Sequence, residues 1–133
     1  MERIRDSFAR QGMMHTLGAR LEHVGEGVVR IVAEVSAATS QQQGAGHAGL
    51  TFSLADSAAG YAALTLMAPD REVVTTEFRI TLLAPARGRL IAEGRVLRPG
   101  RRLIAVAADV WGEDDVHVAT ALGTMVPVSA CPS

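Results

Sequence analysis

The stretch Gly44-Ala45-Gly46-His47-Ala48-Gly49 is a glycine-rich turn, and it leads directly into a nearly apolar run, Leu50 to Met67. Alanine and glycine fill much of this run, and its larger apolar side chains would fall on several faces of a helix, so that no polar stripe is left for solvent. A helix that is apolar all round is a buried helix. The sequence therefore predicts one central helix over 50–67, around which the rest of the chain folds.

Asp56 is the one acidic residue in this run. Burying an ionised carboxyl group is costly unless the group is paired, neutral or used in chemistry. In the middle of a helix the backbone groups are already hydrogen-bonded to one another, so a partner for Asp56 must come from another element. We interpret Asp56 as a functional carboxylate; the alternative is a buried structural acid.

The length and composition indicate a single domain over 1–133. A chain of 133 residues buries about two thirds of its unfolded surface, which is enough for a core. The net charge of -1 gives no general attraction to nucleic acid or to an anionic membrane. The apolar run is not expected to span a membrane, because it carries Asp56 and Pro69 closes it. The N-terminus lacks the apolar segment of a signal peptide, and the single cysteine, Cys131, permits no disulfide framework, so we expect a cytoplasmic protein.

The remaining residues alternate between strand-like runs and turns. A short amphipathic helix is expected over 1–12, and a tail over 127–133. Two strands joined by a glycine turn precede the central helix, and four strands in a meander follow it, which predicts an α+β fold: an antiparallel sheet of about six strands wrapped around one long helix. The expected strands are 16–24, 28–35, 73–83, 89–97, 103–111 and 116–126.

The glycine-rich turn has a literal match to the dinucleotide-binding pattern G-x-G-x-x-G at Gly44, Gly46 and Gly49. That pattern has meaning only in a βαβ unit, and hairpin-linked strands follow here instead, so we reject the nucleotide-binding interpretation. The first turn of a helix nevertheless exposes unpaired backbone N–H groups that favour negative charge. We therefore expect the amides of Ala48 and Gly49 to stabilise an oxyanion.

Histidine has two interpretations at position 47. It either binds the loop at the start of the helix or takes part in the chemistry beside the turn. The four histidines show no spacing typical of metal ligands, so no metal site is predicted. They are His15, His23, His47 and His117.

A spaced set of residues carries a resemblance to a known family: Gln41, then Gly44, then His47-Ala48-Gly49, with Asp56 nine residues after the histidine. Phe52 to Ala58 and Glu77 to Ile80 add to it. Nearly the whole chain resembles the hotdog-fold acyl-CoA thioesterases of the phenylacetic-acid-degradation type. The family has Asn at position 41 and Gly at position 48, and Ala48 keeps the N–H group that an oxyanion needs.

The resemblance implies hydrolysis of an acyl-CoA thioester, with coenzyme A as part of the substrate and no separate cofactor. Asp56 would be the general base or the nucleophile, and His47 and Gln41 would orient the carbonyl group. Thr75 matches a strand hydroxyl that holds the attacking water beside the acid.

Helix geometry adds an expectation about assembly. Nine residues place Asp56 about 180° around the helix from His47 and roughly 13 Å along it, so one chain cannot bring both to one substrate. If both act, a homodimer must share its active sites across a two-fold axis. The family is known for such sites, and the resemblance implies a homotetramer, a dimer of dimers.

Arginine is concentrated in one later turn, at Arg98, Arg101 and Arg102. Its guanidinium group suits the phosphates of coenzyme A, although a solvated turn would have the same composition. Two other functions stay open at this stage: a hotdog hydratase or dehydratase, and a non-catalytic acyl-CoA-binding protein on the same fold.

Overall fold

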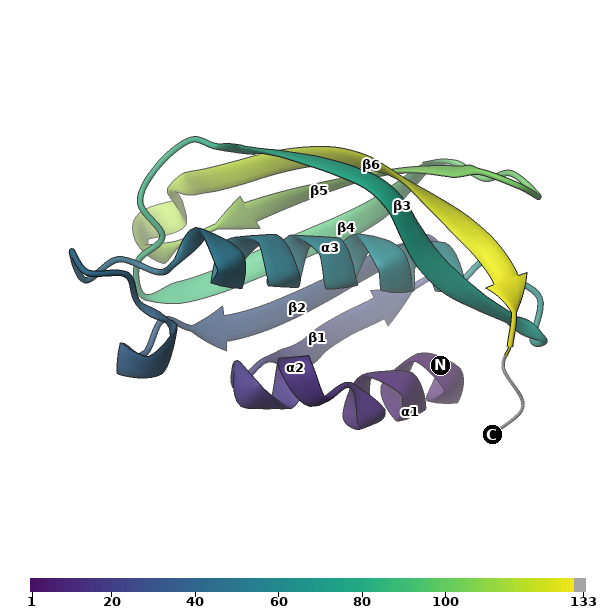
Figure 1. Cartoon of the computed structure of the whole chain (residues 1–133), viewed down its shortest axis with the longest axis horizontal. Helices are drawn as coiled ribbons and strands as arrows, with labels where there is room; N and C mark the ends of the chain where they lie inside the picture. The colour runs from purple at the N-terminus through teal and green to yellow at the C-terminus, as the bar shows by residue number, and fades with distance from the viewer. Residues whose placement is uncertain (131–133) are drawn as a thin grey trace.

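The computed structural model describes residues 1–130, and in it one curved antiparallel sheet wraps around a central helix (Figure 1). The helix is α3 (Ala48–Leu64), and the six strands lie in the order β1-β2-β4-β5-β6-β3. The predicted α+β fold is therefore confirmed. The strands are β1 (Arg20–Gly25), β2 (Val28–Glu34), β3 (Arg71–Leu82), β4 (Arg89–Arg98), β5 (Ile104–Trp111) and β6 (His117–Ser129).

Small residues let α3 lie very close to the sheet. A Cβ atom at Gly94 of β4 would stand 2.2 Å from the backbone carbon of Ala58, so only glycine fits there. Ala55, Ala58 and Ala59 are fully buried at this contact. The alanine residues of the helix and the glycine of the strand are thus both needed for the two backbones to lie this close together.

One side of α3 remains open, contrary to the prediction of a helix without a polar stripe. Ala48, Gly49 and Phe52 are exposed, and Ser53 and Asp56 are half-buried. These positions, with the half-buried Ser57, recur every three or four residues and so share one side of the helix. The prediction was wrong because the sheet covers only the opposite side. We call Ala48, Gly49, Phe52, Ser53, Asp56 and Ser57 the open stripe.

The N-terminal segment also differs from its prediction. It forms α1 (Glu2–Arg10) and then a short second helix, α2 (Gly12–Thr16), so the strand expected from residue 16 begins only at Arg20. The turn between α2 and β1 contains Gly18 at φ 69°, a left-handed conformation that suits glycine. The side chain of Arg3 donates hydrogen bonds of 3.0 Å to the carbonyl oxygens of Met67 and Ala68, which anchors α1 beside the end of α3.

The four-strand meander was predicted incorrectly. β4, β5 and β6 do form a meander, but β3 pairs with β6 at the edge of the sheet, and β4 pairs with β2. The link over 83–88 has the residues of a tight turn, yet it crosses from the sheet edge to the sheet interior, where Ala86 bridges to Gly46. Turn chemistry specifies a reversal and not a partner, and the pairing of β3 with β6 is set by how the sheet curves around α3.

The C-terminal end of the chain is more ordered than predicted. β6 continues to Ser129, and Pro127 pairs with Val73, so the first three residues of the expected tail belong to the sheet. Cys131 lies outside the described residues. In the described part of the chain, no helix is long and apolar enough to cross a membrane.

Candidate active site

The glycine-rich turn is held by backbone hydrogen bonds to two other loops of the chain. The N–H group of Gly46 donates to the carbonyl oxygen of Ala86 at 2.7 Å, and that of His47 donates to Thr39 at 2.9 Å. Gly44 has φ 92°, which only glycine adopts without strain. The start of α3 is therefore held in a fixed position at one end of the molecule (Figure 1).

His47 is the residue that caps α3. Its Nδ1 atom accepts a hydrogen bond of 2.7 Å from the backbone N–H of Gly49. In a neutral imidazole that accepts through Nδ1, the proton is on Nε2, so Nε2 can donate to a ligand. His47 therefore binds the first turn of the helix through one ring nitrogen, and the other ring nitrogen remains available to a ligand.

The two amides predicted to hold an oxyanion are not equivalent. The N–H group of Gly49 is occupied by His47, whereas that of Ala48 has no acceptor among residues 1–130. An unpaired N–H group at a helix N-terminus attracts negative charge. Ala48 is therefore the better placed of the two in this structure.

A first hollow of about 530 Å³ opens beside the capped end of α3. Gln41, His47 and Ala48 lie together in its wall. The side-chain oxygen of Gln41 accepts from the backbone N–H of Gln43, which leaves the NH₂ group of Gln41 as a donor. The other lining residues are Gln42, Ala45, Gly46, Thr51, Leu82, Leu83, Ala84, Pro85, Ala86 and Val118.

Asp56 lies further along α3 and has a partner from another element, as its position required. The hydroxyl of Thr75 in β3 donates to Oδ1 of Asp56 at 2.8 Å. Burial raises the pKa of the Asp56 carboxyl group, and the hydrogen bond from Thr75 acts in the opposite direction and is the smaller effect. A β-bulge between Thr75 and Glu77 interrupts the strand pairing here. Bulges of this kind re-aim side chains beside functional sites.

A second hollow of about 220 Å³ surrounds Asp56, and it shares no lining residue with the first. Asp56 and Thr75 thus meet in one hollow, while Gln41, His47 and Ala48 meet in the other. Within one chain the structure does not bring His47 and Asp56 to a common cavity. The second hollow is lined by Ser7, Gln11, Asp56, Ser57, Gly60, Tyr61, Glu72, Val73 and Thr75.

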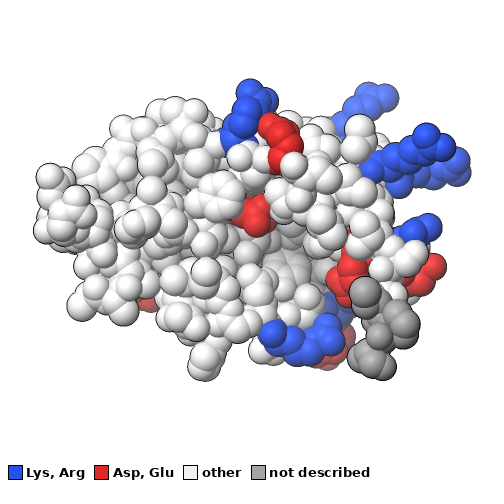
Figure 2. All heavy atoms as spheres, in the orientation of Figure 1, with Lys and Arg blue, Asp and Glu red and all other residues white. Residues whose placement is uncertain are grey.

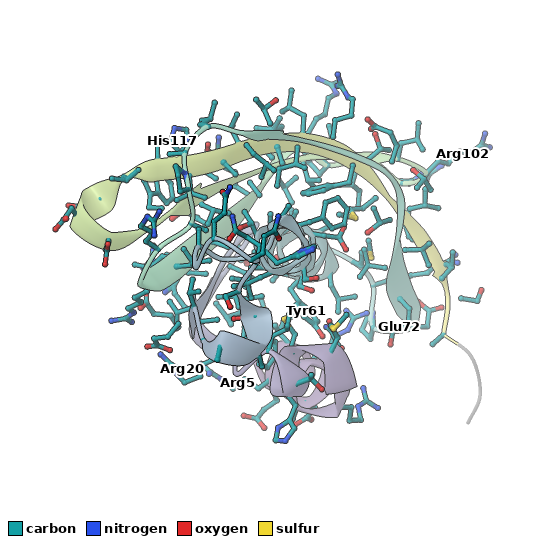
Figure 3. All side chains as sticks on the ribbon, turned by 60° about the vertical axis from the view of Figure 1, so that its left-hand side comes forward. Arg5, Arg20, Tyr61, Glu72, Arg102 and His117 are labelled. Atoms are coloured by element: carbon teal, nitrogen blue, oxygen red, sulfur yellow. The ribbon has the colours of Figure 1, made fainter. Side chains whose placement is uncertain are left out.

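Arg98, Arg101 and Arg102 lie exposed at the turn between β4 and β5. Basic side chains gather at this end of the molecule in Figure 2, opposite the glycine-rich turn, and Arg102 points outward in Figure 3. None of the three lines either hollow.

The sequence did not reveal the part that the N-terminal segment takes in the site. Ser7 and Gln11 line the Asp56 hollow and bind the hydroxyl of Tyr61. Gln11 interrupts the amphipathic pattern of the first helix with a polar side chain, and that was the available signal. Among the described residues, no three metal-ligating side chains come together.

Residues 43–119 match the family model of the thioesterase superfamily, which is more than half of the chain. The chain belongs to the thioesterase superfamily. It is also similar to a thioesterase family protein from Silicibacter pomeroyi, with 37% identity, a TM-score of 0.92 and 96% of each chain covered. Membership of this family makes the protein a thioester hydrolase with a hotdog fold, in agreement with the resemblance.

More distant solved structures share the fold. The PaaI protein of the Escherichia coli phenylacetic acid degradation operon is 21% identical, with a TM-score of 0.87 over 97% of this chain and 93% of that one. A thioesterase from Haemophilus influenzae is 19% identical, with a TM-score of 0.86 over 94% and 88%. At these identities the likeness shows the hotdog fold alone.

Proposed function

We propose that this thioesterase hydrolyses acyl-CoA thioesters to the free acid and coenzyme A. The observation that carries the proposal is the pair Asp56 and Thr75: a carboxyl group with a raised pKa, hydrogen-bonded at 2.8 Å to a strand hydroxyl in a hollow. A raised pKa makes the carboxylate of Asp56 a stronger base for taking a proton from water. Family membership favours hydrolysis over the hydratase and binding-protein alternatives.

In the proposed reaction, water attacks the thioester carbonyl carbon and Asp56 accepts its proton. The carbonyl oxygen becomes an oxyanion, which the N–H group of Ala48 stabilises at the positive end of α3. The Nε2–H of His47 and the NH₂ group of Gln41 orient the carbonyl group. When the carbon–sulfur bond breaks, the coenzyme A thiolate leaves and takes up the proton that Asp56 accepted, which returns Asp56 to its ionised form.

Asp56 has a second route to the same products. As a nucleophile it would form a mixed anhydride with the acyl group and expel the thiolate, and water would then cleave the anhydride. Both routes need the ionised carboxylate of Asp56 and an oxyanion site. Asp56→Asn therefore blocks both routes.

Each complete site requires two subunits in this proposal. His47 and Asp56 line separate hollows, and the open stripe that joins them runs along one side of α3. If two stripes pack antiparallel about a two-fold axis near Phe52, Ala48 of one chain approaches Asp56 of the other, because 52 is midway between 48 and 56. Along α3, residue 56 lies about 12 Å from residue 48. In the antiparallel pair this is the distance along the helix between the two sites of the dimer, while the two halves of each site come together.

The surface around the open stripe supports such an interface. The face seen in Figure 2 is largely free of charge over the glycine-rich turn and the first half of α3. Three large apolar side chains are exposed around the stripe. They are Phe52 of α3 and Val74 and Leu82 of β3, with 38%, 45% and 52% of their surface accessible. β3 is an edge strand of 12 residues, and such an edge offers unpaired backbone groups to a second copy. A homotetramer rests on the family resemblance alone.

We further propose that Arg98, Arg101 and Arg102 bind the phosphates of coenzyme A, which enters only as part of the substrate. Arginine binds phosphate with two parallel hydrogen bonds. Their exposure at the β4–β5 turn supports this assignment, since the nucleotide end of the substrate must lie outside the cavity. No metal or separate cofactor takes part in the proposed reaction, and a cytoplasmic location is proposed with it.

The proposal is tested by thiol release from a panel of short-chain, long-chain and aryl acyl-CoA substrates. The wild-type protein should hydrolyse at least one class, and Asp56→Asn should lose about 10²-fold or more in rate. Asp70→Asn is the matched control, because Asp70 is an exposed acid that lines neither hollow. Hydration of an enoyl-CoA without thiol release would instead support the hydratase alternative.

A further inference from the structure

The inner wall of the Asp56 hollow is a hydrogen-bonded network built on Tyr61. Its hydroxyl accepts from Nε2 of Gln11 at 2.9 Å and lies 3.1 Å from the hydroxyl of Ser7. Oε1 of Gln11 accepts from the hydroxyl of Ser57 at 3.2 Å. Figure 3 shows Tyr61 between α3 and the N-terminal helices. The network therefore joins α1 and α3 across the end of the hollow.

This wall is rigid. Tyr61 is buried, with 6% of its surface accessible, and the ring of Phe8 packs against its ring at 6.1 Å between centroids. Ile4 is fully buried, and Arg3 fixes the start of α1 to the end of α3. These contacts hold the wall in place at the end of the hollow, and any displacement of α1 would break them.

The lining of the hollow is unusually polar for a ligand site. Ligand pockets are mostly apolar and occupy about 300–1,000 Å³, whereas this one has about 220 Å³ and only Gly60 and Val73 as non-polar lining residues. Within the part of the chain that the structure describes, the network uses one N–H of the Gln11 NH₂ group and leaves the other free. A saturated chain would cover this donor without satisfying it, and sites built in this way reject ligands that lack the matching polar group. A small acyl group with its own oxygen would satisfy them.

We propose that Gln11 and Tyr61 are specificity-determining residues, which select a short acyl group carrying a hydrogen-bonding oxygen. This inference rests on the proposed function, because it places the acyl group beside Asp56. Gln11 can donate through its NH₂ group and the Tyr61 hydroxyl can donate or accept, so both an alcohol and a carbonyl group fit. The N-terminal helix α1 then sets both the length and the polarity of the acyl group.

The experiment compares butanoyl-CoA with 3-hydroxybutanoyl-CoA, and both with octanoyl-CoA. The wild-type protein should prefer the hydroxylated substrate over butanoyl-CoA by about 10-fold or more in kcat/KM, chiefly through KM, and octanoyl-CoA should be the poorest. Tyr61→Phe keeps the ring and Gln11→Leu keeps the size; each should reduce the preference toward unity. Ser129→Ala, which removes a hydroxyl outside the lining of the hollow, should leave the preference unchanged.

Two results would overturn the inference: a wild-type protein that prefers butanoyl-CoA or octanoyl-CoA, or a preference that survives in both variants when their thermal unfolding shows them folded. Failure of the proposed function is distinguished by calorimetry on Asp56→Asn. If no substrate is hydrolysed, tighter binding of 3-hydroxybutanoyl-CoA than of butanoyl-CoA still supports the selection, and equal binding contradicts it.

Discussion

The hydroxyl of Thr75 donates a 2.8 Å hydrogen bond to the carboxyl group of Asp56, and this one contact joins the edge strand of the sheet to the open side of the central helix. The bond favours the ionised carboxylate, while burial of Asp56 favours the neutral acid and is the larger effect. The pair thus sets the pH at which the proposed base becomes active.

Thr75→Val should move the acidic limb of the pH–rate profile to higher pH. Without the hydroxyl, only burial acts on the pKa of Asp56, so the carboxyl group ionises later as pH rises. Thr75→Ser restores the donor and should restore the profile. An acidic limb at the same pH in Thr75→Val and wild type would show that this bond does not control the active carboxylate.

Asp56→Asn should stabilise the protein at neutral pH while it abolishes turnover. The folded state has the raised pKa and binds more protons than the unfolded chain, so its stability falls as pH rises from the unfolded value toward the folded one. Asparagine never carries this charge. Thermal unfolding should give a higher Tm than wild type at pH 7, and the difference should disappear below the ordinary aspartate pKa of about 3.8. A lower Tm at pH 7 would indicate a structural acid.

Asp109→Asn should change the Tm in the opposite direction to Asp56→Asn, and it serves as a comparison. Burial raises the pKa of Asp109, but hydrogen bonds from Arg95, Thr120 and His117 and the charge of Arg95 lower it by more. The net shift of this pKa is therefore downward. This stability is present above the unfolded pKa and is lost as pH falls through the folded one. The variant should therefore unfold at a lower Tm at pH 7. Equal behaviour of the two variants would argue against both assignments.

Ser53→Arg should convert the proposed dimer into an inactive monomer. Ser53 lies on the open stripe beside Phe52, and an arginine there would place a charge and a long side chain in the interface. Light scattering would measure the mass, and thiol release the activity. Ala9→Arg, an equal change of size and charge on the exposed side of α1, should alter neither. An active Ser53→Arg monomer would remove the shared-site proposal.

The sequence predicted the elements better than their arrangement. The apolar run and the turns located α3 and all six strands, because burial and chain reversal are local properties. The pairing of β3 with β6 depends on how the sheet closes over the helix, which the turn after β3 does not encode. Likewise, the helix was predicted to be buried all round because alanine and serine give no sign of which side the sheet leaves open.

The candidate site was predicted in the same uneven way. Asp56 stood out as a lone acid, and its need for a partner outside α3 is met by Thr75. The resemblance supplied Gln41 and Thr75, and no spacing in the chain would have paired Thr75 with Asp56. Gln11 and Tyr61 were missed because their contact spans 50 residues and involves two side chains that each look like ordinary packing residues.

The shared site is the central claim, and mixing two inactive variants tests it most directly. His47→Ala and Asp56→Asn damage different halves of the same proposed site, so each homodimer should be nearly inactive. His47→Ala also removes the cap of α3, at a cost of about 1 kcal/mol, so its folding must be verified by thermal unfolding. Random pairing makes about half of the dimers mixed, each with one intact site and one doubly damaged site.

Activity of the co-refolded mixture should therefore return to as much as about a quarter of the wild-type value. If each chain instead holds its own complete site, no pairing contains an intact one. A mixture no more active than its separate components, with subunit exchange verified independently, would contradict the shared site.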